Sequence, residues 1–492
     1  MAHNSQLTTH YSQLITHNSK PTTHRSLLLT LLLLPAVLFG QLNKLQYEVE
    51  AGGLYTTGEE KAFWLLSNND GRFRPGWSSG FAELKLGTKD YQNRDLFYDA
   101  GAKEDTTRAF HLDYGLNIIN TYNGSNDFQL LEYFAEASWK GFHLTAGPQK
   151  KSFGVQYDPL SSGGFLYSRN ARPIPEIAVS SDYISIPYTF GLLEIKGYLS
   201  HGWFEKDRHI ERPYYHHKNL YGRLGQKKWP VFIEYGFHHF AQWGGISPDK
   251  GNLFREWEDI YTMFIATSGE TFETINAYGN HLGSQNLKIT YQAKDFSVEA
   301  FWQTIFEDGS GKRMKNIKDG LWGINFHRNK ENAFIQNVTW EFMHTLHQSG
   351  RYHMIDSVIK GGNDNYFNNG LTYNSGWTYH GYIIGTPFIT SPNLLHTNKG
   401  TRNNRVIMHH VGLNGHITED LSYRTLFSFS KNYGTYANPL VPVRHQFSFL
   451  FQTEYALSKG WHINAAVAGD HGDLFKSKWS AMVSIAKTGM FR

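Results

Sequence analysis

Residues 131–139 read LEYFAEASW, a segment that alternates between two kinds of side chain along its whole length. Leucine, tyrosine, alanine and tryptophan occupy the odd-numbered positions, whereas the even-numbered positions include Glu132 and Glu136. Because successive side chains of a β-strand point to opposite faces of the sheet, this period of two predicts a strand with one apolar face.

The same alternation recurs along the chain from about residue 81, and clusters of Gly, Asn, Asp, Pro and Lys separate the segments. Strands at this spacing predict an all-β protein built from antiparallel hairpins. The other apolar faces are Phe296, Val298, Ala300, Trp302 and Phe306; Leu421, Tyr423, Phe427 and Phe429; Phe447, Phe449, Phe451 and Tyr455; and Trp479, Ala481, Val483 and Ile485.

Aromatic residues make up 15% of the chain, although its mean hydropathy is a polar −0.47. A transmembrane antiparallel β-barrel explains this combination, because its lipid face is apolar and aromatic while its lumen and loops are polar. A secreted β-sandwich with aromatic binding sites is the alternative. Roughly 25 residues for each strand and its connection predict a barrel of about 18 strands.

Charge and cysteine content exclude several classes of protein. The 47 basic and 43 acidic residues give a net charge of +4 without a basic block, which excludes a nucleic-acid-binding protein. The chain has no cysteine, so disulfides, thiolate nucleophiles and cysteine-ligated zinc are excluded. No uncharged apolar stretch approaches the ~20 residues of a transmembrane helix, so any membrane crossing is by strands.

The amino terminus predicts export to the outer membrane. Residues 1–25 contain heptad repeats of Thr, His and Ser, a low-complexity extension that we expect to be disordered or to lie upstream of the true start. A metal-binding histidine tract is the alternative. Residues 26–40 have the apolar run and small-residue end of a signal peptide, with cleavage after Gly40, and the barrel then occupies residues 41–492.

Two further segments predict an assembly signal at the end of the chain and a short helix in a loop. The last strand-like segment runs to Phe491, so it resembles the terminal signal that the barrel assembly machinery recognises, with the aromatic residue one position early. An apolar stripe at a period of 3.6 residues predicts a short helix in a loop, packed against or into the barrel. The stripe consists of Leu253, Trp257, Ile260, Tyr261 and Phe264.

Several segments resemble the Wzi family of capsule assembly proteins, which are outer-membrane barrels that act as lectins. The resemblance runs from about residue 47 to the end. It implies a closed barrel of about eighteen strands, filled by inward-folded loops, that binds capsular polysaccharide or exopolysaccharide without cleaving it. Family members can carry a helical segment ahead of the barrel, which this sequence lacks. The segments are 63–68 (FWLLSN) with Gly71, 152–154 (SFG), 169–175 (RNARPIP), 217–221 (HKNLY), 243–245 (WGG), 279–284 (GNHLGS), 364–369 (DNYFNN) and 375–377 (SGW).

A lectin site needs flat aromatic faces to stack on sugar rings, with amides and carboxylates beside them for the hydroxyl groups. Residues 361–379 supply the richest mixture of this kind. The alternative is that the amides form turns and the aromatic residues fill the barrel. The candidates in this loop are Asn365, Tyr366, Asn368, Tyr373, Trp377 and Tyr379.

Residues 203–221 form a second candidate loop, with Arg212, Tyr214 and Tyr215, although a solvated loop has the same composition. Arg172 begins a rigid RPIP segment and is a candidate either for binding an anionic sugar or for pairing with a carboxylate in the lumen. Trp243 is either a stacking platform or an aromatic residue at the membrane interface.

Catalysis is not predicted. Glycoside hydrolases need two carboxylates at a set separation, which 43 acidic residues neither support nor exclude. The chain lacks the local motifs of serine hydrolases, zinc proteases and phosphate-binding loops. We therefore expect no cofactor and no metal, with polysaccharide, outer-membrane lipid and lipopolysaccharide as partners. A porin or a glycan-conducting channel is the alternative function.

Overall fold

The computed structural model describes most of the chain after residue 44. The described residues are 45–77, 79–88, 110–226, 229–253, 258–265, 279–307, 314–330, 332–350, 354–355, 358–359, 362–368, 372–395, 397 and 399–491. The predicted extension, the predicted signal peptide and Trp257 of the predicted helix lie outside them. Gln46–Gly489 form one compact unit.

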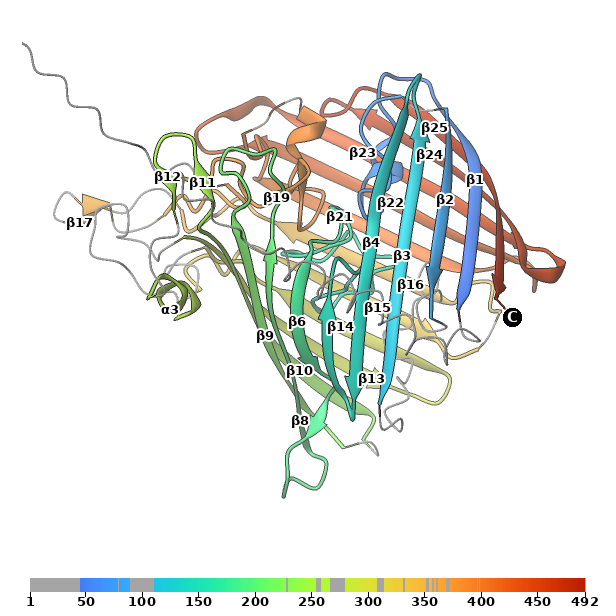
Figure 1. Ribbon diagram of the computed structural model, residues 1–492, viewed down its shortest axis with the longest axis horizontal. Helices are drawn as coiled ribbons and strands as arrows, with labels where there is room; N and C mark the ends of the chain where they lie inside the picture. The colour runs from blue at the N-terminus through green and yellow to red at the C-terminus, as the bar shows by residue number, and fades with distance from the viewer. Residues whose placement is uncertain are drawn as a thin grey trace, which may run out of the picture. The chain divides into compact units, whose positions relative to one another are not determined.

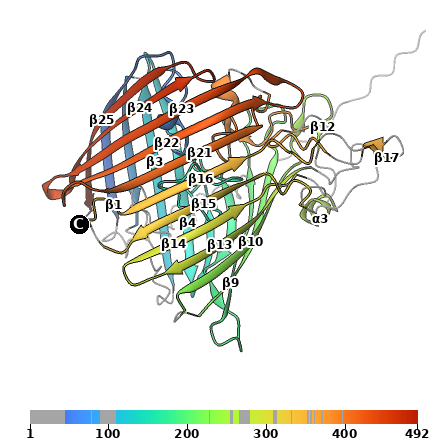
Figure 2. The same ribbon diagram turned by 180° about the vertical axis from the view of Figure 1, so that it is seen from behind.

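The strands of this unit close into a barrel (Figure 1, Figure 2). The main sheet has 19 strands joined by antiparallel pairing, and β25 pairs with β1. Because β6 and β7 lie one after the other along β8, they share one position, and the closed barrel has the 18 strands that the sequence predicts. The strands are β1 Gln46–Thr56, β2 Gly80–Gly87, β3 His111–Tyr122, β4 Asn126–Trp139, β5 Phe142–Ala146, β6 Glu176–Ser181, β7 Ile184–Ser185, β8 Leu193–Trp203, β9 Tyr214–Leu224, β10 Val231–Trp243, β13 Asn280–Gln292, β14 Phe296–Gln303, β15 Gly320–Arg328, β16 Asn337–His344, β21 Val406–His416, β22 Leu421–Gly434, β23 Pro439–Ala456, β24 Trp461–Gly472 and β25 Lys478–Met490.

The predicted apolar faces are the outer faces of the barrel. Trp139, Phe427 and Trp479 are 54%, 41% and 57% exposed, as side chains that face lipid rather than a protein core would be. Leu131, at 1% exposed, points inward instead, and Phe306 and Tyr423 of the predicted faces are also buried, at 6% each. A bulge leaves Leu131 without a partner on β3, since Asn117 pairs with Glu132 and Ile118 with Leu130, so the alternation is interrupted at this residue.

The two ends of the barrel differ in their connections. At the end where β1 begins, tight turns join β4 to β5 at residues 140–141 and β13 to β14 at residues 293–295; we call this the turn end. At the opposite end, the loop end, long connections follow β1, β5 and β16 at residues 57–79, 147–175 and 345–405. All three long loops contribute to the interior of the barrel.

The three loops fill the lumen as a plug, which confirms the predicted inward-folded loops. Their buried side chains, such as Trp64, Phe165 and Trp377, form one apolar core with wall residues such as Leu450. Helix α2 (Phe63–Leu66) lies in this core. The shorter elements are β11 Ile246–Ser247, β12 Gly251–Asn252, β17 Met354–Ile355, β18 Val358–Ile359, β19 Thr378–Tyr379, β20 Tyr382–Ile383, η4 Pro392–Leu395 and η5 Ser458–Gly460.

The last strands of the barrel hold the start of α2. The backbone N–H of Phe63 donates to Oδ2 of Asp470 on β24 at 3.0 Å, and that of Ala62 donates to Oγ of Ser480 on β25 at 2.8 Å. These side chains satisfy backbone donors that have no partner inside the helix.

Helix α3 (Glu258–Ile265) confirms the predicted helical loop segment over the residues that the structure describes. It packs on the outer side of the wall beside β10 (Figure 1, Figure 2). Met263 contacts Ala241 and Trp243, whose side chains point away from the lumen. In the described part of the chain, every helix is too short or too polar to cross a membrane.

Candidate functional site

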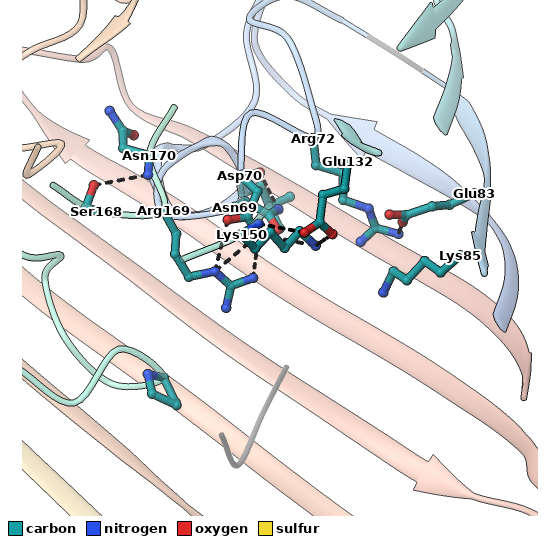
Figure 3. Close-up of polar contacts among 12 residues, drawn as sticks. Asn69, Asp70, Arg72, Glu83, Lys85, Glu132, Lys150, Ser168, Arg169 and Asn170 are labelled. Carbon is teal, nitrogen blue, oxygen red and sulfur yellow. Dashed lines mark hydrogen bonds and ion pairs between the residues drawn. The ribbon is translucent and has the colours of Figure 1, made fainter. Parts of the chain in front are cut away.

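Two of the motif segments meet inside the barrel (Figure 3). Arg169, from the loop after β5, donates from Nε to both carboxylate oxygens of Asp70 at 3.1 Å, and its Nη2 lies 2.5 Å from Oδ2. The backbone N–H of Asp70 in turn donates to the carbonyl of Arg169. This reciprocal contact joins the first and second plug loops.

Ion pairs connect the same plug loops to the wall. Arg72 lies 2.5 Å from carboxylate oxygens of both Glu50 and Glu83, which point inward from β1 and β2. Lys150 lies 3.4 Å from Asp70 and 3.8 Å from Glu132 on β4. The wall thus supplies carboxylates and the plug supplies cations, a charge arrangement that positions the plug inside the barrel.

The third plug loop is held by hydrogen bonds to the second. Asn170 donates to the carbonyl of Ile383 at 2.9 Å and Ser168 donates to the carbonyl of Gly385 at 2.7 Å. The hydroxyl of Tyr382 donates to the carbonyl of Phe73 at 2.8 Å, which ties the third loop to the first. The three loops therefore form one body.

A group of cations and phenols lies where the plug reaches the loop end, around the hairpin of β19 and β20. Arg208 is buried there, donates to the carbonyls of Thr378 and Gly376 at 2.9 Å, and stacks on Phe204. Its charge is partly met by Glu205 at 3.4 Å. We call this group the loop-end cluster; it comprises Arg74, Arg172, Arg208, Tyr379, His380 and Tyr382.

Arg172 differs from the other arginines of the plug because it forms no ion pair with any residue that the structure describes. Its Nε is buried and has no hydrogen-bond partner among them. The side chain passes over Gly71, where an added Cβ would lie 2.6 Å from its Cγ. The absence of a Cβ at Gly71 therefore makes room for this guanidinium.

The arginines of the cluster repel one another and His380, as the causes of two pKa shifts indicate. Burial, and then repulsion from Arg172 and Arg74, lowers the pKa of His380 to about 4. Burial followed by repulsion from Arg74 also lowers the pKa of Arg172. Asp127 lies 2.7 Å from Arg74 and also attracts Arg172, and Asp207 attracts His380, so both carboxylates partly offset the repulsion. An anion at the cluster would relieve this repulsion.

The predicted aromatic residues of the third loop are packed inside the plug. Tyr366 and Trp377 are 0% exposed, and Tyr373 and Tyr379 are also buried. The hydroxyl of Tyr366 donates to Oδ2 of Asp319 at 2.8 Å. Ligand contact by these rings stays a prediction, and it would require the plug to open.

The predicted amides of that loop build its turns. Oδ1 of Asn365 accepts from Nδ2 of Asn404 at 2.9 Å and from Nδ2 of Asn368 at 3.1 Å. Asn368 also bonds the backbone of Thr401 through both ends of its amide. In this conformation the amides form hydrogen bonds that stabilise the loop itself.

The other candidates are scattered. Tyr215 points into the lumen and packs on Phe204, whereas Tyr214 and Trp243 lie on the outer wall with ring centroids 4.8 Å apart. Arg212 is exposed. Of the eleven candidates, the structure places Arg172 and Tyr379 in the loop-end cluster.

Four members of the cluster were not among the sequence candidates: Arg74, Arg208, His380 and Tyr382. These residues lie in or next to segments that the sequence had already marked, since Arg74 comes after the FWLLSN motif, Arg208 lies within residues 203–221 and His380 follows Tyr379 directly. A basic residue next to a motif is too common a signal to single out. Among the described residues, no group of three or more His, Asp or Glu side chains is placed to hold a metal ion.

The fold and the site define a plugged antiparallel β-barrel, with an ion-paired lumen and a cationic cluster at the loop end. A model of the family described as capsule assembly protein Wzi matches residues 67–390. This match covers more than half of the chain, so the protein belongs to the Wzi family.

One solved structure supports the fold. A Wzi structure, described as an outer membrane protein involved in group 1 capsule assembly in Escherichia coli and as a carbohydrate-binding β-barrel, is 14% identical with a TM-score of 0.51; the match covers 96% of this chain and 90% of that chain. OccAB4 of Acinetobacter baumannii (10% identical, TM-score 0.43, 92% and 99% covered) and OprD of Pseudomonas aeruginosa (8%, 0.44, 91% and 94%) are weaker matches. No curated protein sequence matches significantly.

Proposed function

We propose that this protein is an outer-membrane lectin that holds an acidic capsular polysaccharide or exopolysaccharide on the cell surface. Outer-membrane barrels place short turns in the periplasm and long loops outside. The loop-end cluster then faces the exterior, where such a polymer lies. The carbohydrate-binding barrel of Escherichia coli and the family's role in capsule assembly support this assignment.

The guanidinium of Arg172 is the observation that carries the proposal. Arg172 forms no ion pair with a carboxylate among the described residues, and its neighbours include Arg74 and His380, so its guanidinium is suited to a carboxylate or a sulfate of a polymer. Trp77, on the same loop as Arg74, is 48% exposed and offers an aromatic face for a sugar ring.

Binding without cleavage follows from the chemistry of the cluster. Cations and phenols attract and orient an anionic glycan, whereas glycoside hydrolysis uses a facing pair of carboxylates. Burial raises the pKa of Glu205, and its Oε1 accepts the backbone N–H of His380, so this carboxyl is engaged in the loop structure. We therefore assign no catalytic residue.

The outer wall and the last strand suggest the remaining partners. Exposed aromatic side chains such as Trp139, Trp461 and Trp479 give the wall a surface suited to lipid and lipopolysaccharide. The alternating last strand is suited to recognition by the barrel assembly machinery. We propose, from the sequence pattern, that residues 26–40 are the export signal.

Replacement of Arg172 tests the proposed function. Arg172→Gln should weaken capture of acidic polysaccharide from the source strain by about tenfold or more, the loss expected for one charge-assisted hydrogen bond. Arg402→Gln is the matched control, because Arg402 is an exposed arginine on the third loop outside the cluster. Capture is measured with detergent-purified protein that retains the heat-modifiable gel shift of a folded barrel. Equal capture by parent and Arg172→Gln would overturn the proposal.

A further inference from the structure

The hairpin that joins β7 to β8 presents two aromatic side chains to the outside of the molecule. Tyr188 is 96% exposed and Phe190 is 92% exposed. Both residues lie at the tip of this hairpin, which projects past the ends of the neighbouring strands at the turn end (Figure 1, Figure 2). Large aromatic side chains exposed together to this extent indicate a surface that meets a partner.

The backbone holds these two rings in place in a strained conformation. Tyr188 has a φ of +65° and Phe190 a φ of +52°, in the left-handed region that aromatic residues rarely adopt. Hydrogen bonds fix the turn: the N–H of Leu192 donates to the carbonyl of Thr189 at 2.9 Å, and the hydroxyl of Thr189 donates to the carbonyl of Ile186 at 2.7 Å. Glycine or asparagine would adopt this backbone with less strain. The stability of the hairpin therefore does not account for aromatic side chains at these positions.

A second turn extends the same surface. The backbone N–H of Gly225, at the start of the turn between β9 and β10, donates to the carbonyl of Leu192 at 2.9 Å. Trp229 on that turn is 48% exposed. We call Tyr188, Phe190 and Trp229 the tip patch. Tyrosine and tryptophan are the residues that membrane proteins favour at the boundary between membrane and water.

The tip patch continues the lipid-facing side of the barrel wall. Leu193 and Ile195 on the outer face of β8 are 38% and 41% exposed. Ile184 on β7, which pairs with Ile195, is 37% exposed. The outer face of the hairpin is thus an apolar surface that runs from the wall toward the tip.

The hairpin differs from other short connections at the turn end in its lack of charge. Residues 183–193 read YISIPYTFGLL, without a charged side chain. The turns that follow β4, β13, β21 and β23 do contain charges, namely those of Lys140, Lys294, Glu419 and Lys459. An uncharged apolar turn is suited to contact with lipid, because no charge has to leave water.

The length of β8 places the tip patch at the level of the lipid headgroups. The 11 residues of β8 run from Leu193 to Trp203. At ~3.3 Å per residue and a tilt of ~40° they span about 25 Å, the height of the apolar band of such barrels. Phe190 precedes Leu193 in the chain and lies at most roughly 10 Å beyond it. The headgroup layer on either side of the hydrocarbon core is about 5–8 Å thick, so the tip reaches that layer.

We propose that the tip patch contacts phospholipid in the periplasmic leaflet of the outer membrane and anchors this side of the barrel there. The rings lie at the boundary between headgroups and acyl chains, where their apolar faces leave water while the tyrosine hydroxyl and the indole N–H stay hydrated. The inference goes beyond the proposed function, and it rests on the barrel's place in the outer membrane rather than on glycan binding.

The absence of cysteine from the chain allows the tip to be labelled at a single site. Phe190→Cys carries an environment-sensitive fluorophore, and the full chain is placed in nanodiscs of phosphatidylethanolamine and phosphatidylglycerol. Iodide in the water should quench this label several-fold less than a label at Lys459→Cys, and a phospholipid with a nitroxide near its headgroup should quench it several-fold more. Lys459 is the matched control, because it is an exposed turn residue at the same end with a φ of +60°.

A second site and a separate assay keep the test decisive. Tyr188→Cys replaces Phe190→Cys if that variant loses its heat-modifiable gel shift. Equal iodide quenching at the hairpin and at Lys459→Cys would overturn the proposal and leave the tip patch for a periplasmic protein. Capture of acidic polysaccharide by the hairpin variants should equal that of the parent, because the loop-end cluster lies at the other end of the barrel. Failure of lipid contact is therefore distinguishable from failure of glycan binding.

Discussion

His380 is held in its neutral form near neutral pH, because burial and the charges of Arg172 and Arg74 lower its pKa to about 4. A polysaccharide carboxylate bound beside it would offset that repulsion and raise the pKa of the bound state. Binding would then take up a proton between the two pKa values. Affinity should therefore rise as the pH falls through the bound-state pKa and level off near pH 4.

We predict that the affinity for acidic polysaccharide increases between pH 7 and pH 5, and that His380→Gln removes this increase while binding at pH 7 stays similar. Surface plasmon resonance at a constant ionic strength measures both. A neutral polymer such as dextran controls for general effects of pH. An identical pH profile in parent and His380→Gln would place the polymer's charge away from His380.

The composition of a loop does not show which of its residues could contact a sugar. Asparagine, tyrosine and tryptophan in a loop have the same composition whether they meet sugar or fill a barrel. Trp377 and Tyr366 are buried because the loop folds inward, which depends on contacts with distant residues such as Asn316 and Asp319. Arg172 was recognised as a candidate, but the sequence could not show that it forms no ion pair with the residues that the structure describes.

At the scale of elements, ion pairs join the plug loops to the wall strands and to one another, and Asp70 with Arg169 joins the first plug loop to the second. Asp70 and Arg169 are 5% and 20% exposed, so their contact is more shielded from water than a surface ion pair. Loss of one partner leaves the other buried and uncompensated, which destabilises more than loss of both. The two residues should therefore be coupled.

A double-mutant cycle with Asp70→Asn and Arg169→Gln should give a coupling energy of about 1–3 kcal/mol. Hydrogen exchange of the plug loops, read by mass spectrometry, measures the stability of each variant locally. Glu48 and Lys85 form the control pair, since they lie 2.9 Å apart on the wall strands β1 and β2. Additive effects of the two plug substitutions would show that this contact does not hold the loops together.

Strand periodicity was sufficient to predict the strands of the wall. Each strand faces lipid on its outer side and the lumen on its inner side, and this difference imposes an alternation of side chains. The periodicity failed at Leu131, where a bulge rather than the alternation sets the direction of the side chain. The short helix is confirmed over Glu258–Ile265, but Leu253 of the predicted stripe precedes it and Tyr261 is 67% exposed, whereas Met263 packs on the wall. The elements of the plug have no such period, because they are surrounded by protein on all sides.

At the scale of the whole molecule, three loops from distant parts of the chain fill one lumen. We predict that the purified protein gives no steady open-channel current in planar bilayers, because the plug core is apolar and its rim is ion-paired. A general porin inserted under the same conditions provides the positive control. A large, steady conductance would favour the glycan-conducting channel over the plugged lectin.

The hydrogen bonds that join β24 and β25 to the start of α2 have a consequence for assembly of the barrel. The loop after β1 is synthesised early, yet Asp470 and Ser480, which fix the start of its helix, belong to the last strands to be made. An assembly intermediate that lacks these strands cannot complete the helix's contacts. We therefore expect closure of the seam between β25 and β1 and the final seating of the plug to be coupled during assembly.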